Sequence, residues 1–295
     1  GRGSMSNTAT VLAFDFGASS GRAIRAVYDG QNLTYEEIHR FENVPIEKDG
    51  HLCWDVETLL KEIHTAIQKA GTFDSLGFDT WGVDFGLLDA DGHLLANPVH
   101  YRDVRTNGKP EQAAACMPAE ELYAHTGNQI MAINTLFQLL ALQEQEPELL
   151  QKAEQILFMP DLFAALLGAE PVCERSIAST SQMLDPRTGQ WSREVLTAYG
   201  LKENHFAPLV ASGTVTGTLT TGAKIIAVAG HDTQCASAAM PCAEEDAEHT
   251  AFLSCGTWSL LGTELDTPIL TADSCQSGLS NELGANGKIN YLKNI

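Results

Sequence analysis

The chain has 295 residues and a formal net charge of −20, with 18 Lys and Arg against 38 Asp and Glu. So few basic residues exclude a nucleic-acid partner, because phosphate backbones are bound by concentrated Lys and Arg. Hydrophobic residues make up 44% of the chain, which is enough for a substantial core. No apolar run approaches the roughly 18 residues that cross a bilayer, so we expect no membrane partner.

The cysteines and the first residues predict a cytoplasmic protein. The seven cysteines are odd in number and lack CxxC or Cys/His metal spacing, which is typical of free thiols in a reducing compartment. No basic segment leads into a long apolar stretch, so we expect no signal peptide. Residues 1–6 are interpreted as a tag remnant and a disordered start, because GRGSM resembles a cloning remnant before Met5.

The first 70 residues predict a β-hairpin, a third strand and a helix. β-rich runs at residues 11–16 and 22–28 flank a Gly- and Ser-rich turn, and TYEEIHRFENVP is typical of another strand. Asp55 precedes apolar residues at helical spacing, so we expect it to cap a helix.

A second hairpin is predicted next, with a buried strand around Phe78, another at residues 85–88 and a turn at Asp91 and Gly92. Helical patterns then dominate from about residue 111 to residue 167. The residues typical of helix starts in this region are Pro118, Asn134 and Pro160.

The last third predicts two more strand-and-turn units. Residues 225–229 form a buried strand before a Gly turn and a helix, and HTAFLSCGTWSLLGTEL repeats the strand, Gly turn, strand layout of the first hairpin. This repetition indicates an internal duplication, and two domains with a cleft between them. INYLKNI predicts a strand with few residues left to cover its sheet, so we expect the chain to end inside the second domain.

The string DFGASSGR, residues 15–22, predicts an anion-binding turn. Its small side chains let backbone N–H groups approach a phosphate, and Arg22 adds a cationic fork. Asp15 ends the preceding strand and would hold Mg²⁺. A plain hairpin turn without ligand fits the same residues. SCGTWS, residues 254–259, is a second turn of this kind, in which Thr257 would contact a phosphate.

Two further strings contain acids in apolar surroundings. In GHDT, residues 230–233, Asp232 would lie at the carboxyl edge of the sheet and accept a proton from a hydroxyl, or else simply cap a helix. DTWGVDFGLLD, residues 79–89, contains Asp79 and Asp84, which need partners when buried. Arg102 and Arg105 would supply such partners, although a β-bulge with surface acids remains an alternative.

Together, DFGASSGR, DTWGVDFGLLD, GHDT and SCGTWSLLG resemble the FGGY family of carbohydrate kinases over the whole chain from Val11 onward. The resemblance implies an α/β, ribonuclease-H-like (actin-like ATPase) fold with one complete N-terminal domain and a truncated second copy. It implies a sugar-binding domain at residues 7–240 and the beginning of an ATP-binding domain at residues 241–295. The implied cofactors are ATP and Mg²⁺.

The resemblance also implies residue roles. L-Rhamnulose is the expected ketose, phosphorylated at its C1 hydroxyl with Asp232 as general base. The sugar contacts implied are Gly82, His231, Thr233 and Asn294. The ATP contacts implied are Ala18, Ser19, Ser20, Gly21, Arg22 and Thr257.

Three other functions fit the same residues. The sugar specificity of a kinase rests on a few hydrogen bonds, so a fuculokinase or a kinase of another ketose remains open. A non-catalytic actin-like ATPase or sugar-binding module would share the fold. A metal hydrolase would require Asp15, Asp79 and Asp232 to converge on two metal ions.

Overall fold

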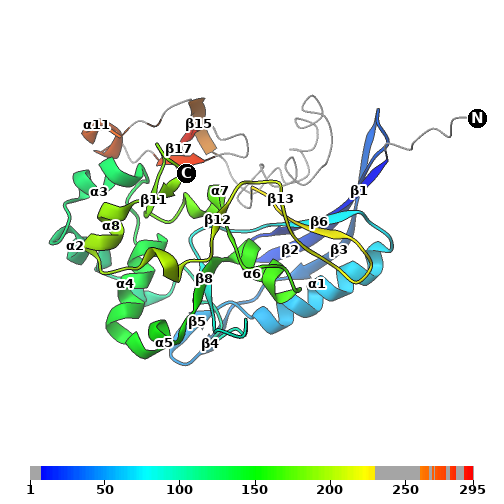
Figure 1. Ribbon diagram of the computed structural model, residues 1–295, viewed down its shortest axis with the longest axis horizontal. Helices are drawn as coiled ribbons and strands as arrows, with labels where there is room; N and C mark the ends of the chain where they lie inside the picture. The colour runs from blue at the N-terminus through cyan, green and yellow to red at the C-terminus, as the bar shows by residue number, and fades with distance from the viewer. Residues whose placement is uncertain are drawn as a thin grey trace, which may run out of the picture.

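The computed structural model describes residues 8–229, 260–265, 268, 270–276, 280–283 and 289–294. At its centre is a six-stranded sheet with the strand order β13-β14-β6-β1-β2-β3 (Figure 1). The strands of this sheet are β1 (Ala9–Phe16), β2 (Ser20–Tyr28), β3 (Leu33–Glu42), β6 (Ser75–Asp79), β13 (Thr214–Thr218) and β14 (Lys224–Ala227). β1, β2 and β3 are antiparallel, whereas β6 runs parallel to both β1 and β14. The predicted hairpin and third strand are therefore confirmed.

The two faces of the sheet are packed differently because strand residues alternate between them. Phe14 and Phe16 belong to the main hydrophobic core, together with Leu59 of α1 (Val56–Ala70) and Phe163 of α6 (Met159–Leu166). As predicted, Asp55 caps α1, and its carboxylate accepts from the Thr58 N–H at 3.2 Å. The opposite face carries a much smaller apolar cluster, which consists of Val11, Ile24, Ala26 and Val228.

The predicted helical region contains α2 (Lys109–Ala114), α3 (Ala119–Thr126), α4 (Thr135–Gln145), α5 (Pro147–Lys152) and α6. All three predicted starts are confirmed. Pro118 and Asn134 are the N-cap residues of α3 and α4, and Pro160 lies in the first turn of α6. A strand that the helical pattern concealed, β8 (Gln155–Phe158), lies between α5 and α6.

The strand pairing predicted for the second hairpin is wrong. Both strands form, but β6 pairs with β1 and β14, whereas β7 (Phe85–Leu88) pairs with β8. The reason is the tight turn at residues 80–84, which carries the chain out of the central sheet instead of folding β7 back onto β6. The turn at Asp91 and Gly92 is confirmed, and Leu88 bridges to Leu94 across it.

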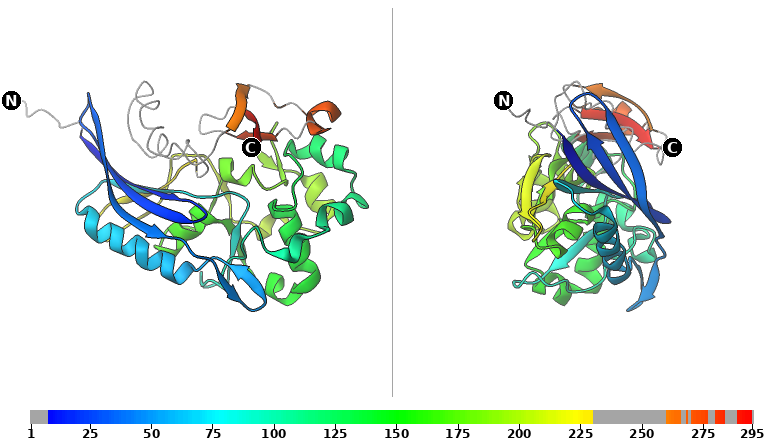
Figure 2. Two further views of the ribbon diagram at one scale, coloured as in Figure 1. Left: turned by 180° about the vertical axis from the view of Figure 1, so that it is seen from behind. Right: turned by 90° about the vertical axis from the view of Figure 1, so that its right-hand side faces the viewer.

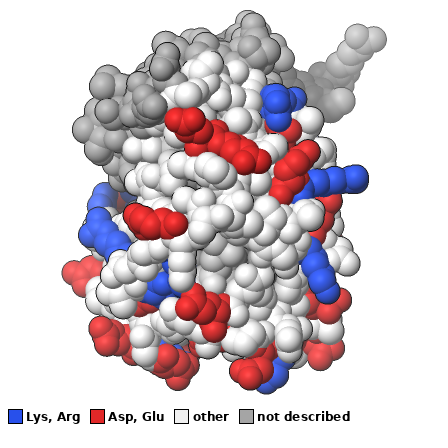
Figure 3. Space-filling model, turned by 90° about the vertical axis from the view of Figure 1, so that its left-hand side faces the viewer, with Lys and Arg blue, Asp and Glu red and all other residues white. Residues whose placement is uncertain are grey.

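The remaining described elements are short and connect the main layers. They are β4 (Ile46–Lys48), β5 (His51–Cys53), η1 (Val104–Thr106), β9 (Cys173–Glu174), α7 (Arg175–Ala178), β10 (Leu184–Asp185), β11 (Gln190–Trp191), α8 (Arg193–Ala198), η2 (Glu203–His205) and β12 (Leu209–Val210). Figure 3 shows Lys and Arg interspersed with Asp and Glu on one face of the molecule. None of the described helices combines the length and apolar character needed to span a membrane.

Toward the end of the chain, α11 (Ala272–Gln276) is followed by part of a second sheet. β15 (Leu260–Leu265), β16 (Ser280–Leu283) and β17 (Ile289–Asn294) form it in the order β15-β17-β16. α11 contacts α3 and β16 contacts α7, so this part lies against the helical side of the molecule and not on the central sheet (Figure 2). The strand predicted at INYLKNI is confirmed as β17. The helix predicted after residue 229 lies outside the described residues.

Gly21 is fixed by packing next to the turn of the first hairpin. A Cβ placed on it would lie 2.3 Å from Phe41 Cζ and 2.8 Å from Phe16 Cδ1. These two rings pack edge to face, with centroids 5.4 Å apart, and both belong to the main core. Neither ring can withdraw without opening that core, so only glycine fits beneath them.

We expect Gly21→Ala to lower the free energy of unfolding by about 1–3 kcal/mol, the usual cost of overpacking a core. Urea unfolding would measure this change. Gly17→Ala is the matched control, because its Cβ would meet only the Ser20 carbonyl oxygen, at 3.2 Å. Equal losses in the two variants would contradict the packing role of Gly21.

Candidate functional site

Two carboxylates and an arginine meet at one edge of the central sheet. Asp15 and Asp79 are register partners at the carboxyl ends of the parallel strands β1 and β6, and Arg22 lies opposite Asp15 on β2. Arg22 Nε donates to Asp15 Oδ2 at 3.0 Å. The Asp15 side chain is 11% exposed and Asp79 is buried. Alternation along β1 places Asp15 on the face opposite Phe14 and the main core.

This pair of acids fits a magnesium ion chemically, since Mg²⁺ prefers carboxylate oxygens and retains water and phosphate ligands. The sequence predicts Asp15 as a metal ligand, and the strand register places Asp79 beside it. Within the described residues, the cluster of three groups close enough to share an ion is instead Asp89, Asp91 and His93, on an exposed turn.

The turn between β1 and β2 presents exposed residues on a fixed backbone. Ala18, Ser19 and Ser20 are exposed, whereas Gly21 is buried. Asn43 holds the turn from behind: its backbone N–H donates to the Ser19 carbonyl at 3.0 Å, and its side-chain amide donates to the Gly17 carbonyl at 2.9 Å. With carbonyls turned toward Asn43, the exposed side of this turn remains available to an anion.

A cavity of about 390 Å³ lies beside the turn at residues 80–84. Gly82, the predicted sugar contact, lines it. Among the other residues of its wall are Trp81, Tyr101, Arg102, Gln129 and Glu282. Glu282 belongs to β16, so the cavity is completed by a segment about 200 residues beyond Gly82 in the chain.

The backbone at this cavity is strained and held on both sides. Val83 has a φ of 65°, which is unfavourable for a β-branched residue. Its N–H donates to Thr180 Oγ1 at 3.2 Å, and its carbonyl accepts from Thr135 Oγ1 at 2.6 Å. Gly82 packs so closely that a Cβ would lie 3.1 Å from Thr180 Oγ1. Strain maintained in this way is typical of functional sites.

Asp84 anchors the layer behind the cavity. Its fully buried carboxylate accepts from Trp54 Nε1 at 2.6 Å, from Gln138 Nε2 at 2.8 Å and from the Tyr101 N–H at 3.2 Å. Burial raises the pKa of Asp84 to about 7, although the hydrogen bonds and the nearby Arg105 charge oppose the rise. Because the Trp54 ring stacks on Trp81 at 3.8 Å, Asp84 fixes the wall indirectly.

The sequence indicates Arg102 and Arg105 as partners of the two buried acids. In the structure Arg105 is linked to one of them, and the link is indirect. Arg105 reaches Asp84 through Gln138, since Arg105 Nη2 donates to Gln138 Oε1 at 2.9 Å. Arg102 instead lines the cavity, with its guanidinium 5.6 Å from the centre of the Tyr101 ring.

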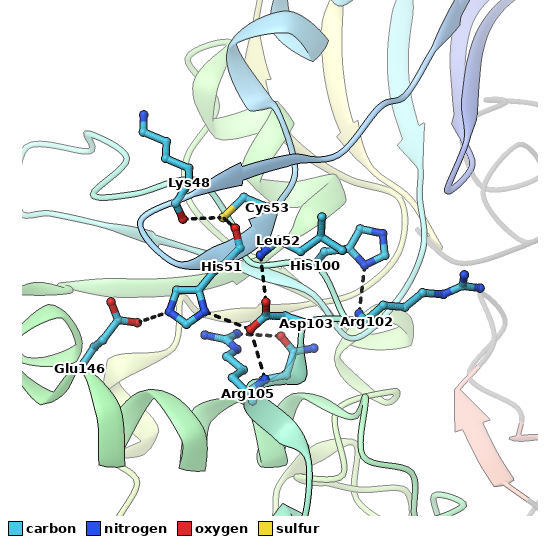
Figure 4. A network of polar contacts seen from close by, with 10 residues as sticks. Lys48, His51, Leu52, Cys53, His100, Arg102, Asp103, Arg105 and Glu146 are labelled. Atoms are coloured by element: carbon cyan, nitrogen blue, oxygen red, sulfur yellow. Dashed lines mark hydrogen bonds and ion pairs between the residues drawn. The ribbon is translucent and has the colours of Figure 1, made fainter.

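A polar network fixes the segment that carries both arginines (Figure 4). Asp103 accepts from the backbone N–H groups of Leu52 and Arg105, at 2.9 and 3.2 Å, and contacts His51 Nδ1 at 3.0 Å. His100 Nδ1 accepts from the Arg102 N–H at 3.0 Å. Burial, helped by the Arg102 charge, lowers the pKa of His100 to about 4, which keeps this acceptor unprotonated at neutral pH.

Several predicted site residues lie outside the described part of the chain, namely His231, Asp232, Thr233 and Thr257. Asn294 ends β17, where its backbone is the register partner of Leu260. Trp81, Gln129 and Glu282 line the cavity as well, and the sequence did not predict them. Trp81 could have been found beside Gly82, but no local pattern marks Gln129 or Glu282.

Comparison with known proteins identifies the class. Residues 10–238 match the model of the N-terminal domain of the FGGY family of carbohydrate kinases, so the chain belongs to this family. It is 41% identical over 297 residues to a rhamnulokinase of Bacteroides thetaiotaomicron, an alignment that covers 96% of this chain and 61% of that protein. The chain therefore spans about three-fifths of the length of this curated relative.

Solved structures share the fold at low identity. A gluconate kinase of Lactobacillus acidophilus superposes with a TM-score of 0.77 at 16% identity, covering 97% of this chain and 59% of that one. Glycerol kinase of Plasmodium falciparum with ADP gives a TM-score of 0.69 at 15% identity, covering 97% and 60%. The predicted fold class, a mixed α/β, actin-like N-terminal domain, is confirmed.

The raised pKa of Asp84 predicts a pH-dependent stability. Between about pH 4 and pH 7 the folded protein holds a proton that the unfolded chain has released, so this residue makes stability fall as pH rises through that window. We expect Asp84→Asn to remove this dependence. The difference in free energy of unfolding between the variant and the original protein should move in favour of the variant by roughly 4 kcal/mol from pH 4 to pH 8, which is the order of magnitude that the pKa shift implies.

Urea unfolding at several pH values from 4 to 8 would measure the difference. Asp91→Asn, at an exposed turn, is the control. A constant offset between Asp84→Asn and the original protein at every pH would show that the carboxyl of Asp84 is ionised throughout.

Proposed function

We propose that the full-length protein phosphorylates a ketose with ATP, and that its substrate is L-rhamnulose, giving L-rhamnulose 1-phosphate. The observation that carries this proposal is the 41% identity to a rhamnulokinase across 96% of the chain. It is supported by a cavity of sugar size at Gly82, the position that the resemblance assigns to a sugar contact.

In the proposed reaction the C1 hydroxyl oxygen attacks the γ-phosphorus of ATP, the bond to the β-phosphate oxygen breaks, and ADP leaves. Asp232 accepts the hydroxyl proton and orients the attacking oxygen, which is the main protein contribution to a phosphoryl transfer. His231, Thr233 and Asn294 contribute further contacts to the sugar. Their roles rest on the family motif.

The phosphates of ATP are bound at the turn between β1 and β2. Ala18, Ser19 and Ser20 offer the exposed side of the turn, and Thr257, in the second glycine-containing string of the sequence, contributes a further phosphate contact that rests on the family motif. Gly21 contributes by allowing the turn to pack on Phe41, and Arg22 contributes its charge beside Asp15. Asp15 and Asp79 would hold Mg²⁺, and the ion would supply positive charge against the phosphates during transfer.

We propose the same domain division that the sequence indicates, with a sugar-binding domain at residues 7–240 and the start of an ATP-binding domain at residues 241–295. The end of the match to the family's N-terminal domain, at residue 238, supports a boundary near residue 240.

The proposed base can be tested by Asp232→Asn in the full-length protein. We expect kcat to fall by roughly 10²–10⁴-fold with little change in sugar affinity, because the variant keeps the shape of the side chain and loses the proton acceptor. A coupled assay of ADP release over a panel of ketoses would measure both, with Asp29→Asn at an exposed loop as the control.

The same assay separates the alternatives. Preference for another ketose would replace L-rhamnulose and leave the kinase reaction in place. ATP hydrolysis at one rate with and without every sugar would instead favour an actin-like ATPase. Turnover of Asp232→Asn near that of the original protein would remove Asp232 from the role of base.

A further inference from the structure

The stacked indoles of Trp54 and Trp81, beside the cavity, differ in the hydrogen bonding of their N–H groups. The Trp54 N–H donates to Asp84 Oδ2 at 2.6 Å, whereas the Trp81 N–H has no hydrogen-bond partner among the described residues. Both rings are buried, with 0% and 4% of their surface exposed. The rings lie 3.8 Å apart, but only Trp81 lines the cavity. An unpaired donor in so dry a position is costly, and few occur in folded proteins.

Gln129 presents the complementary group in the same wall. Its side-chain carbonyl Oε1 is buried and has no hydrogen-bond partner in the described part of the chain. Its backbone is nevertheless fixed on both sides: the N–H donates to Ser280 Oγ at 3.2 Å, and the carbonyl accepts from Asn134 Nδ2 at 2.9 Å. The unpaired acceptor therefore does not result from a loosely held segment.

The pairing of an N–H donor with a carbonyl acceptor indicates the chemistry of the ligand. A hydroxyl group both donates and accepts, so a molecule with several hydroxyls can satisfy Trp81 and Gln129 together. An apolar ligand would leave both groups unpaired, and an anion would be repelled by the Gln129 oxygen. The charged groups among the described lining residues, Arg102 and Glu282, are of opposite sign, which favours a ligand without net charge.

We propose that Trp81 and Gln129 determine the sugar specificity of the kinase. The indole N–H of Trp81 donates to one hydroxyl of the bound ketose, and Gln129 Oε1 accepts from another. Neither is the reacting hydroxyl, so both residues act on recognition and not on proton transfer. This inference rests on the proposed function, because it assigns the cavity to the sugar substrate.

The first test changes the sugar and leaves the protein intact. L-Rhamnulose and its analogues that each lack one non-reacting hydroxyl would be compared by kcat/KM in the full-length protein. We expect at least two analogues to lose roughly 10- to 100-fold, since removing a hydroxyl leaves a buried protein group unpaired again. Losses below about threefold for every analogue would overturn the proposal.

The second test changes the protein. Trp81→Phe keeps the stacked ring and loses the N–H, and Gln129→Met keeps the length of the side chain and loses the oxygen. Each substitution should raise KM for the sugar by roughly 10- to 100-fold. KM for ATP should stay unchanged, and kcat should keep its order of magnitude. Each variant should also become indifferent to one particular missing hydroxyl, because the partner of that hydroxyl is gone.

Matched controls are available elsewhere in the chain. Trp191→Phe loses a buried indole that lies outside the cavity wall, and Gln143→Met loses an amide that donates to the Tyr199 carbonyl at 3.2 Å. Both controls should keep the preferences of the original protein among the analogues. Variants that retain full discrimination between sugar and analogue would overturn the assignment even if their KM values rose.

The outcomes also separate this inference from the proposed function. A protein that phosphorylates no ketose would overturn the proposed function. A protein that phosphorylates L-rhamnulose but discriminates normally in both variants would overturn only the roles of Trp81 and Gln129. If Trp81→Phe fails to fold, Gln129→Met and the analogue series still decide the question, because Gln129 is only partly buried.

Discussion

The buried carboxylate of Asp84 is the interaction on which the candidate sugar cavity depends. It joins three parts of the chain: Trp54, which follows β5; Tyr101, in the loop after β7; and Gln138, on α4. Each donates a hydrogen bond to an acid that water cannot reach, so the loss of any one would leave a charge or a polar group without compensation. The cost of burying this acid is offset only when all three segments are in place. The hydrogen bonds of Asp84 therefore hold Trp81 and Tyr101 in place in the cavity wall.

The strands and helices could be predicted wherever a local pattern determined them. The β1–β2 hairpin, the cap at Asp55 and the helix starts at Pro118 and Asn134 all follow from residues that are neighbours in the sequence. The pairing of β7 with β8 was missed because about 65 residues separate the partners, and only the turn at Gly82 and Val83 decides that β7 leaves the central sheet. Candidate site residues follow the same rule. Gly82 was found from its motif, whereas Gln129 and Glu282 reach the cavity through tertiary contacts that no local pattern encodes.

The two faces of the central sheet explain why the one acid of β1, Asp15, stands between two core residues, Phe14 and Phe16. One face packs Phe14 and Phe16 against the helices, and its hydrophobic burial stabilises the sheet. The other face carries Asp15, with Arg22 opposite and Asp79 on the adjacent strand. A shift of β1 by one residue in register would exchange the faces of this strand and turn Asp15 into the core. The register that is favoured by packing is thus also the one that gathers the charged groups at a single edge.

The cavity is completed by residues beyond the part of the chain that matches the family's N-terminal domain. Ser280 lies in β16, where its hydroxyl contacts Gln129, and the Asn281 N–H donates to the Gly127 carbonyl at 2.7 Å. The Leu283 N–H donates to Ser179 Oγ at 2.9 Å, so β16 is held to two different segments of the part that matches the family's N-terminal domain. The bonds of Ser280 and Leu283 are partly buried, and separating β16 from the helices would leave several polar groups unpaired. The cavity wall and the start of the second sheet therefore form one packed unit, and a change that displaced β16 would alter the surroundings of Gln129 as well.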